Sequence, residues 1–392
     1  MKVILSVPGK WHLFQVAREL EKRGLLHRIY TSFPKFKVYP KEGIPKDKLK
    51  CLPLGEACMQ IAKRLPGKQR SLAGNLLWML KNDFFDREVA ARLRRQEPGF
   101  VYHGLSSAQS RSLRRAKDAG MKTILERSST HVLFQNKIME EEYKKFGVPI
   151  RDHQPDWLVR NELREYEIAD KILVPTHFVK KTFMDEGVDE KKILVIPFGT
   201  NLDTGRLSAQ PKKNGKFTVL YVGHVDFRKG VPYILEAAKS LCSKASDIEF
   251  VLVGPVRPLF KRLLSGYSDV CQVLGYVGHD RLAEIYSRAD LFVFPSLEEG
   301  LALVQLEAMS HGLPVLSTCN AGAEEIIESG REGYILPLRD SAAIEERVLE
   351  LYHDRARCRQ MGEAAKKKAL VQSWSNYAER LIYEYRALLQ GS

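Results

Sequence analysis

Short apolar runs alternate with helical patterns through almost the whole chain of 392 residues, and this alternation restricts the fold more than any other feature. Such an order is typical of parallel sheets whose faces are covered by helices. A helix is expected at residues 12–22, with Gly24 as its stop. In the first half, the expected strands are residues 2–7, 100–103, 123–125, 171–174 and 193–196.

The alternation is interrupted once, after Phe198, by a polar segment that contains Gly, Pro and Asn. Residues 201–215 therefore predict a linker between two domains. A second series of strands follows, at residues 217–223, 250–254, 272–274, 290–294 and 314–318. We expect one doubly wound domain at residues 1–200 and a second at 216–372. Their ligands should bind in a deep cleft between them, beyond the carboxyl ends of the strands.

The composition is that of a globular protein rather than a membrane-spanning one. The apolar share of 44% is enough for ordinary cores, and no apolar run approaches the roughly 18 residues that would span a bilayer. The start of the chain is too short for a signal peptide, which favours a cytoplasmic location. The six cysteines are scattered without a Cys-x-x-Cys pair or a zinc-like spacing, and this predicts reduced thiols.

The positive charge is concentrated in the first half of the chain. Residues 1–200 carry 38 Lys and Arg against 24 Asp and Glu, whereas residues 201–392 carry 24 of each, so the first half holds the whole excess of +14. The densest basic stretches are residues 35–50, 63–70, 92–95 and 111–117. They suggest a face that meets nucleic acid, an acidic membrane or a phosphorylated substrate. A merely solvated basic surface is the alternative.

Two carboxylates, Glu299 and Glu307, surround the expected start of a helix at residues 302–311, which follows a buried strand and a loop. The loop contains Gly300, and the start of the helix offers free N–H groups where a phosphate could sit. Helical geometry over eight residues places the two carboxylates roughly 12 Å apart on nearly the same side. One could then meet a sugar while the other meets a ribose, as in a site for a sugar nucleotide.

A basic loop follows the first strand of the second series. The strand ends at Gly223, and Arg228 and Lys229 come just before the next helix. A glycine lets a ligand approach the backbone, and the two cations can neutralise a departing diphosphate. By itself such a loop is more often a solvated turn. Together with the two glutamates it indicates a nucleotide-sugar site.

These segments resemble the retaining glycosyltransferases of family four, which have the GT-B architecture, and the resemblance extends over most of the chain. It is carried by residues 169–176, 195–199, 223–230, 286–296, 299–314, 321–327 and 373–378. It implies two Rossmann-like domains, the first for the acceptor and the second for the nucleotide sugar. Residues 373–392 would form a C-terminal helix that returns to the first domain.

The resemblance also assigns roles on the donor side. It gives Lys229 to the donor diphosphate, Glu307 to the ribose hydroxyls and Glu299 to the donor sugar. The backbone of Gly300, Leu301, Ala302 and Leu303 would meet phosphate and sugar oxygens. The family usually has Arg directly after the strand-ending glycine, where this chain has His224. Either Arg228 or a protonated His224 supplies the missing charge, and we favour Arg228.

The first domain departs further from the family pattern. Only Gly9 follows the first strand, where the family often has paired glycines near the donor phosphates, and Lys10 could compensate. On the acceptor side, the resemblance and the strand ends point to His103, Arg127 and His131. Each of these three is as compatible with a scaffold role as with a binding role.

The expected activity is retaining transfer of a hexosyl group from a UDP or GDP sugar to a saccharide or lipid-linked acceptor in cell-surface polysaccharide or glycolipid synthesis. No cofactor is expected, and no metal, because the chain has no Asp-x-Asp triplet. No nucleic-acid partner is expected either. The alternatives are a same-fold epimerase or phosphorylase, and a non-catalytic anion-binding protein. A membrane contact at the cytoplasmic face is a further possibility. An apolar stripe lies beside Lys63 and Arg64, at Leu54, Cys58, Ile61, Ala62 and Leu65.

Overall fold

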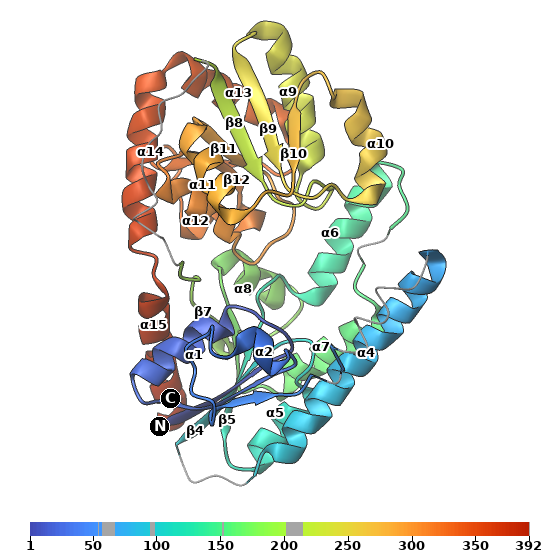
Figure 1. Ribbon diagram of the computed structural model, residues 1–392, viewed down its shortest axis with the longest axis vertical. Helices are drawn as coiled ribbons and strands as arrows, with labels where there is room; N and C mark the ends of the chain where they lie inside the picture. The colour runs from blue at the N-terminus through green and yellow to red at the C-terminus, as the bar shows by residue number, and fades with distance from the viewer. Residues whose placement is uncertain (54, 57–66, 95–98, 151–152, 201–214, 392) are drawn as a thin grey trace.

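The computed structural model describes residues 1–53, 55–56, 67–94, 99–150, 153–200 and 215–391. Two α/β units lie one above the other along the long axis of the molecule (Figure 1). Each unit has its own parallel sheet, which confirms the expected pair of doubly wound units. The predicted linker lies outside the described residues, apart from Gly215.

The sheet of the first unit has seven strands in the order β3-β2-β1-β4-β5-β6-β7, and all neighbouring strands are parallel. The order reverses between β1 and β4, which is where the ligands of such sheets bind. The strands are β1 (Lys2–Val7), β2 (Leu26–Thr31), β3 (Leu49–Cys51), β4 (Phe100–Leu105), β5 (Lys122–Glu126), β6 (Lys171–Val174) and β7 (Ile193–Val195).

Helices connect these strands, as the sequence pattern predicts. The helices are α1 (Leu13–Lys22), α2 (Lys35–Val38), α4 (Gly67–Arg92), α5 (Ser110–Asp118), α6 (Val132–Lys145), α7 (Asp156–Ile168) and α8 (His177–Met184), with a short 3-10 turn η1 (Glu190–Lys192). The prediction for α1 is confirmed to within one residue, and Gly24 follows it with a left-handed φ of 68°.

The sheet of the second unit has six parallel strands in the order β10-β9-β8-β11-β12-β13, with the reversal between β8 and β11. The strands are β8 (Phe217–Val222), β9 (Ile248–Val253), β10 (Gln272–Gly275), β11 (Leu291–Phe294), β12 (Val315–Thr318) and β13 (Gly333–Leu336). The helices are α9 (Val231–Lys244), α10 (Lys261–Leu264), α11 (His279–Arg288), α12 (Leu303–Ser310), α13 (Ser341–His353) and α14 (Arg355–Leu370). Short 3-10 turns are η3 (Pro258–Phe260), η4 (Ser265–Tyr267), η5 (Cys319–Ala321) and η6 (Ala323–Glu325).

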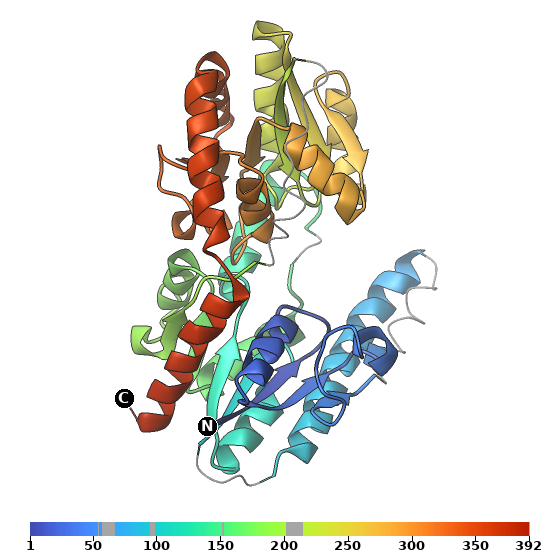
Figure 2. The same cartoon turned by 60° about the vertical axis from the view of Figure 1, so that its left-hand side comes forward.

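The last helix, α15 (Trp374–Gln390), returns to the first unit, as the resemblance implies. Figure 2 shows α14 along the second unit and α15 along the first. Ser373 precedes the helix as its N-cap, and its hydroxyl accepts the N–H of Asn376 at 3.1 Å. Trp374 stacks on His12 of the first unit, with ring centroids 5.8 Å apart. None of the described helices combines the length and the apolar character that crossing a bilayer requires.

A buried chain of polar groups connects α15 to the first sheet. Glu126, at the end of β5, contacts the Nε2 atom of His12 and lies 3.0 Å from the Nε2 atom of His103. The other ring nitrogen of His103 lies 2.6 Å from the hydroxyl of Tyr385 in α15. Burial alone would raise the pKa of the Glu126 carboxyl, but His12 and His103 outweigh it and lower the pKa to about 2.

Replacing Tyr385 with Phe should destabilise the protein by about 1–3 kcal/mol, because it leaves a buried nitrogen of His103 without its partner. Urea denaturation of Tyr385→Phe and the wild type measures this difference. Tyr383→Phe on the same helix is the matched control, since Tyr383 is 70% exposed and should be silent. Equal midpoints for Tyr385→Phe and the wild type would show that the bond contributes nothing.

Candidate active site

The predicted donor residues gather at the carboxyl ends of β8 and β11, where the strand order of the second sheet reverses. The loop after β8 contains Gly223, His224, Arg228 and Lys229, and the loop after β11 contains Glu298 and Glu299. The two loops are in contact, because the N–H of Leu297 donates to the carbonyl of Arg228 at 2.9 Å. The topology therefore brings together residues that are about seventy positions apart.

A glycine allows this close approach. Gly230 precedes α9 with a left-handed φ of 69°, and a Cβ atom there would overlap the carbonyl of Pro295. The preceding turn is closed by Asp226, whose carboxylate accepts the N–H of Lys229 at 2.9 Å. The backbone thus fixes the basic loop against the loop after β11.

Glu299 lies between the two cations of the basic loop. Its Oε1 atom contacts the Nζ atom of Lys229, lies 3.4 Å from Nη1 of Arg228, and accepts the hydroxyl of Ser296 at 3.1 Å. The sequence assigns the cations to a diphosphate and the carboxylate to a sugar. In the structure, these groups neutralise one another.

Burial disfavours the charged forms of both Arg228 and Lys229, and by itself it would lower their pKa values. Burial and the neighbouring charge of Arg228 lower the pKa of Lys229 to about 7, despite its contact with Glu299. Burial also opposes the charge of Arg228, but the carboxylates of Glu298 and Asp226 outweigh it and raise the pKa of Arg228. At neutral pH, Arg228 is fully charged and Lys229 is close to its titration midpoint.

Glu307 lies on α12, in a less polar environment than Glu299. The hydroxyl of Tyr286 donates to its Oε2 atom at 3.3 Å. Burial raises the pKa of the Glu307 carboxyl, and the bond from Tyr286 offsets this only in part. A hydroxyl pair of a ribose offers the donors that such a carboxylate lacks.

The expected spacing of the two glutamates applied helical geometry from Glu299 onward, and the structure does not support that assumption. The helix α12 begins at Leu303, so Glu299, Gly300, Leu301 and Ala302 belong to the preceding loop, where the helical rise does not apply. The N–H of Ala302 already donates to the carbonyl of Ala321 at 3.3 Å. A phosphate contact to Ala302 would require this bond to break.

Glu298, which the sequence analysis did not single out, bridges the two units. It is completely buried, and its Oε1 atom accepts the hydroxyls of Ser129 and, at 2.8 Å, Thr130 of the first unit. Its Oε2 atom accepts the side chain of Gln135 and, from the second unit, that of Arg228, both at 3.2 Å. Burial would raise the pKa of Glu298, but Arg228 and the hydroxyl donors outweigh it and lower the pKa.

The glycine after Glu299 also lies against the first unit. A Cβ atom on Gly300 would overlap the carbonyl of Ser128, and the hydroxyl of Thr176 donates to the carbonyl of Gly300 at 3.3 Å. The donor loop and the loop after β5 therefore touch through their backbones.

Comparison with known proteins identifies the second unit. Residues 206–368 match the family of glycosyl transferases group 1. The second unit belongs to this family. Alpha-D-kanosaminyltransferase of Streptomyces kanamyceticus is 26% identical, over 95% of this chain and 98% of that enzyme. Lipopolysaccharide 1,2-N-acetylglucosaminetransferase of Salmonella typhimurium is 28% identical, over 55% of this chain and 62% of that enzyme.

The crystal structure of HepE from Anabaena in complex with UDP superimposes with a TM-score of 0.65 at 14% identity, over 99% of this chain and 100% of that chain. The glycosyltransferase therefore has the GT-B fold, as the sequence predicts. Within the described part of the chain, no three His, Cys, Asp or Glu side chains are placed to share a metal ion.

The structure also bears on the charge that replaces the usual arginine of the family. Burial and the positive charge of Arg257 lower the pKa of His224, which favours the neutral ring. Arg228 stays charged and lies beside Glu299. The assignment to Arg228 stays a prediction, and these two observations favour it.

The three predicted acceptor residues of the glycosyltransferase lie in the interior. His103 is fully buried between Glu126 and Tyr385. His131 caps α6 by accepting the N–H of Leu133 at 3.4 Å, and burial together with the charge of Arg127 lowers its pKa to about 4. Their contact with an acceptor stays a prediction, while their burial supports a scaffold role.

Arg127, also predicted to bind the acceptor, is 8% exposed and is joined to Glu162 at 2.7 Å. It also donates to Gln135 at 3.1 Å, and Gln135 in turn reaches Glu298. Of the three predicted acceptor residues, Arg127 is therefore connected to the donor loop through one intervening side chain. An acceptor contact for Arg127 stays a prediction as well.

The first strand of the glycosyltransferase ends in the expected turn. Gly9 has a φ of 142°, and its carbonyl accepts the hydroxyl of Thr31 at 2.7 Å. Lys10 pairs with Glu42 at 2.5 Å, although its side chain is still 43% exposed. A donor contact at Gly9 stays a prediction, and Lys10 has a carboxylate partner already.

Proposed function

We propose that this glycosyltransferase moves a hexosyl group, with retention, from a nucleotide diphosphate sugar to a saccharide or lipid-linked acceptor. The observation that carries the proposal is the convergence of Arg228, Lys229 and Glu299 at the strand reversal of the second sheet. The UDP in the superimposed HepE structure supports a uridine nucleotide as the donor carrier. The name of the Salmonella relative supports a cell-surface glycan as the acceptor.

The chemistry follows from an exchange of partners. A diphosphate carries more negative charge than a carboxylate, so it displaces Glu299 from Lys229 and Arg228. The two cations then stabilise the charge that develops on the leaving nucleotide. The released carboxylate of Glu299 is free to accept hydrogen bonds from the hydroxyls of the donor sugar. The nucleophile is a hydroxyl of the acceptor, and its proton passes to the leaving phosphate on the same face of the sugar.

A thermal-shift screen of UDP, GDP, ADP and their sugar conjugates tests the donor assignment. A ligand at about one hundred times its Kd stabilises a protein by about 2.7 kcal/mol, so the correct base should raise Tm clearly above the others. If none of the nucleotides stabilises the protein, the donor assignment is wrong. Turnover of the donor sugar without any acceptor would favour an epimerase or phosphorylase, and NMR of the product anomer tests retention.

Replacing Glu307 with Ala should weaken nucleotide binding by about tenfold to a hundredfold, because hydrogen bonds to a charged group contribute about 1.5–3 kcal/mol. Turnover at saturating donor should change little, since Glu307 would contact the ribose and not the reacting sugar. Calorimetric titration with the nucleotide and separate measurement of kcat distinguish the two effects. The control is Glu363→Ala, an exposed glutamate on α14. Unchanged nucleotide affinity in Glu307→Ala would rule out the ribose assignment.

A further inference from the structure

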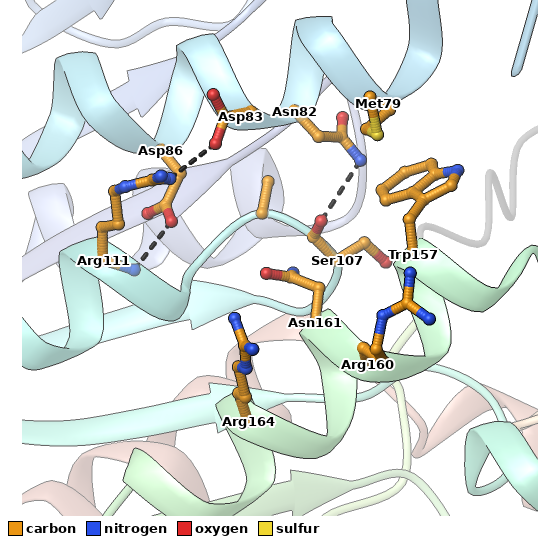
Figure 3. Close-up of a pocket in the computed structure, with 11 residues that line it drawn as sticks. Met79, Asn82, Asp83, Asp86, Ser107, Arg111, Trp157, Arg160, Asn161 and Arg164 are labelled. Carbon is orange, nitrogen blue, oxygen red and sulfur yellow. Dashed lines mark hydrogen bonds and ion pairs between the residues drawn. The ribbon is translucent and has the colours of Figure 1, made fainter. Parts of the chain in front are cut away.

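A cavity of about 190 Å³ in the first unit has no assigned role in the donor site. It lies between α4, α5, α7 and the loop after β4, and Figure 3 shows its lining. Three arginines contribute to its wall, Arg111 from α5 and Arg160 and Arg164 from α7. The side chains of Arg160 and Arg164 extend from α7 toward α4 and α5 (Figure 3).

We infer that this pocket binds a phosphate group of the acceptor, as a phosphomonoester or a phosphodiester. The inference rests on the proposed function, because it names the chemistry of the acceptor for the same transfer. The phosphate would be held by Arg160 and Arg164, and the rest of the acceptor would extend toward the donor loop.

Among the described residues, the carboxylates around the pocket have partners other than Arg160 and Arg164. Asp83 is bonded to Arg111 at 2.5 Å. Asp86 accepts the backbone N–H groups of Arg111 and Ser112, at 2.7 and 2.9 Å, so it caps α5. Among the described residues, Arg160 and Arg164 pair with no carboxylate. Both carboxylates of the pocket are therefore engaged, and both arginines of α7 are available to an anion.

A second cavity extends the basic surface. It has a volume of about 430 Å³ and shares Asp83, Arg111, Asn161 and Arg164 with the first. Arg114 and Arg115 add two further cations to its lining, against the single additional acid Asp118. These arginines belong to one of the basic stretches of the sequence, at residues 111–117. The tertiary structure thus combines this stretch with α7, which the sequence pattern does not connect to it.

The wall of the pocket lies directly after β4, at the strand reversal of the first sheet. Ser107 has a φ of 91°, an unfavourable value for a residue other than glycine. Glu165 accepts its N–H at 2.8 Å and Glu162 accepts its hydroxyl at 2.7 Å, and these bonds hold the strained backbone. Strained backbone that is held in this way is common at ligand sites.

The pocket is connected to the donor loop by a short series of contacts. Glu162, which holds Ser107, also binds Arg127, and Arg127 reaches Glu298 through Gln135. The loops after β4 and β5 lie at the same carboxyl edge of the first sheet, and the β5 loop touches Gly300. An acceptor anchored by its phosphate in the pocket therefore has its remaining length on the side of the donor sugar.

The phosphate could belong to a soluble sugar phosphate or to a lipid phosphate. Trp157 and Met79 give the lining of the pocket an apolar part, and Leu76 and Leu80, on the same helix as Met79, are 54% and 49% exposed. Such a surface suits a lipid chain, whereas the arginines recognise the phosphate in either molecule. The same chemistry therefore has two sources, which binding measurements can separate.

The test compares the wild type with Arg160→Ala/Arg164→Ala. The control, Arg359→Ala/Arg380→Ala, removes the same two charges from exposed positions on α14 and α15. The probes are glucose 6-phosphate against glucose, by titration, and vesicles of phosphatidylglycerol against phosphatidylcholine, by flotation. Loss of two charge-assisted contacts should weaken phosphate binding by about tenfold or more in Arg160→Ala/Arg164→Ala, the pocket variant, and not in the control. If the arginine-dependent binding is seen with glucose 6-phosphate, the acceptor is a soluble sugar phosphate. If it is seen with phosphatidylglycerol vesicles, the acceptor is a lipid phosphate.

The inference is overturned if the wild type binds neither probe, if the pocket variant binds as well as the wild type, or if the control loses as much. Nucleotide binding is measured in the same samples and should be equal in all three proteins. Normal nucleotide binding without arginine-dependent phosphate binding contradicts only the pocket. Absence of nucleotide binding in the wild type contradicts the proposed donor site instead.

Discussion

The variant Lys229→Ala is expected to lose about 10²–10³-fold in kcat/KM, which is the usual effect of removing one group that stabilises charge in a transition state. Lys229 is 9% exposed and is fixed against Glu299, so no neighbouring lysine can take its place without moving the loop. Steady-state kinetics with the donor identified by the nucleotide screen measure the loss. Lys367→Ala, at an exposed lysine on α14, is the control and should behave as the wild type.

Lys229 also predicts a dependence of donor binding on pH. Its pKa is about 7 in the free protein, and a bound diphosphate raises it by favouring the charged form. Above pH 7, binding therefore takes up a proton and the affinity falls as the pH rises; below pH 7, Lys229 is already charged and this dependence disappears. Calorimetry at pH 8 in two buffers of different ionisation enthalpy measures the uptake. The same uptake in Lys229→Ala would assign the proton to another group.

The same shift affects the stability of the fold. In the unfolded chain the pKa of Lys229 returns to its usual 10.5, so between pH 7 and 10.5 the unfolded state binds more protons than the folded one. The contribution of Lys229 to the free energy of unfolding therefore rises with pH across this window.

The variant Glu298→Ala is expected to destabilise the protein by about 3–5 kcal/mol, the typical cost of removing one partner from a buried ion pair. It removes the buried carboxylate that pairs with Arg228, which is also the acceptor that Ser129, Thr130 and Gln135 share. Because these groups belong to different units, the two units should also separate. Urea denaturation gives the stability, and small-angle scattering gives the radius of gyration, which should increase.

Two further variants make the Glu298 experiment specific. Glu298→Gln keeps the shape and one acceptor oxygen, so it should lose less stability than Glu298→Ala. Glu328→Ala, at an exposed glutamate of the same unit, should have no effect on either measurement. If Glu298→Ala keeps both the stability and the radius of gyration of the wild type, the carboxylate does not hold the two units together.

The strands that the sequence predicted correctly are those with uninterrupted apolar runs. The bounds of β1 and β6 were predicted to the residue. The strand β2 was missed because His27 and Arg28 interrupt its apolar pattern, although both are half-buried in the sheet. The strands β3 and β13 were missed as well, because Lys50 interrupts β3 and β13 begins with Gly333, a residue type that is rare in strands.

The convergence of Arg228, Lys229 and Glu299 was predictable because these residues lie in two short segments of the chain. The role of Glu298 was not predictable, since nothing in the sequence distinguishes it from its neighbour Glu299. Only the fold shows that Glu298 faces Ser129 and Thr130. The burial of the three expected acceptor residues was not predictable for a related reason. Arg127 looks like a free cation in the sequence, but its partner Glu162 lies 35 positions later on another helix.

The return of α15 to the first unit has a consequence for the order in which the molecule matures. The first unit receives Trp374 against His12 and Tyr385 against His103 from residues that the ribosome adds late. All strands and helices of the second unit have been synthesised by the end of α14. The unit translated first is therefore completed last, and a nascent chain that stops before residue 374 exposes the unfinished core of its N-terminal unit to chaperones and proteases.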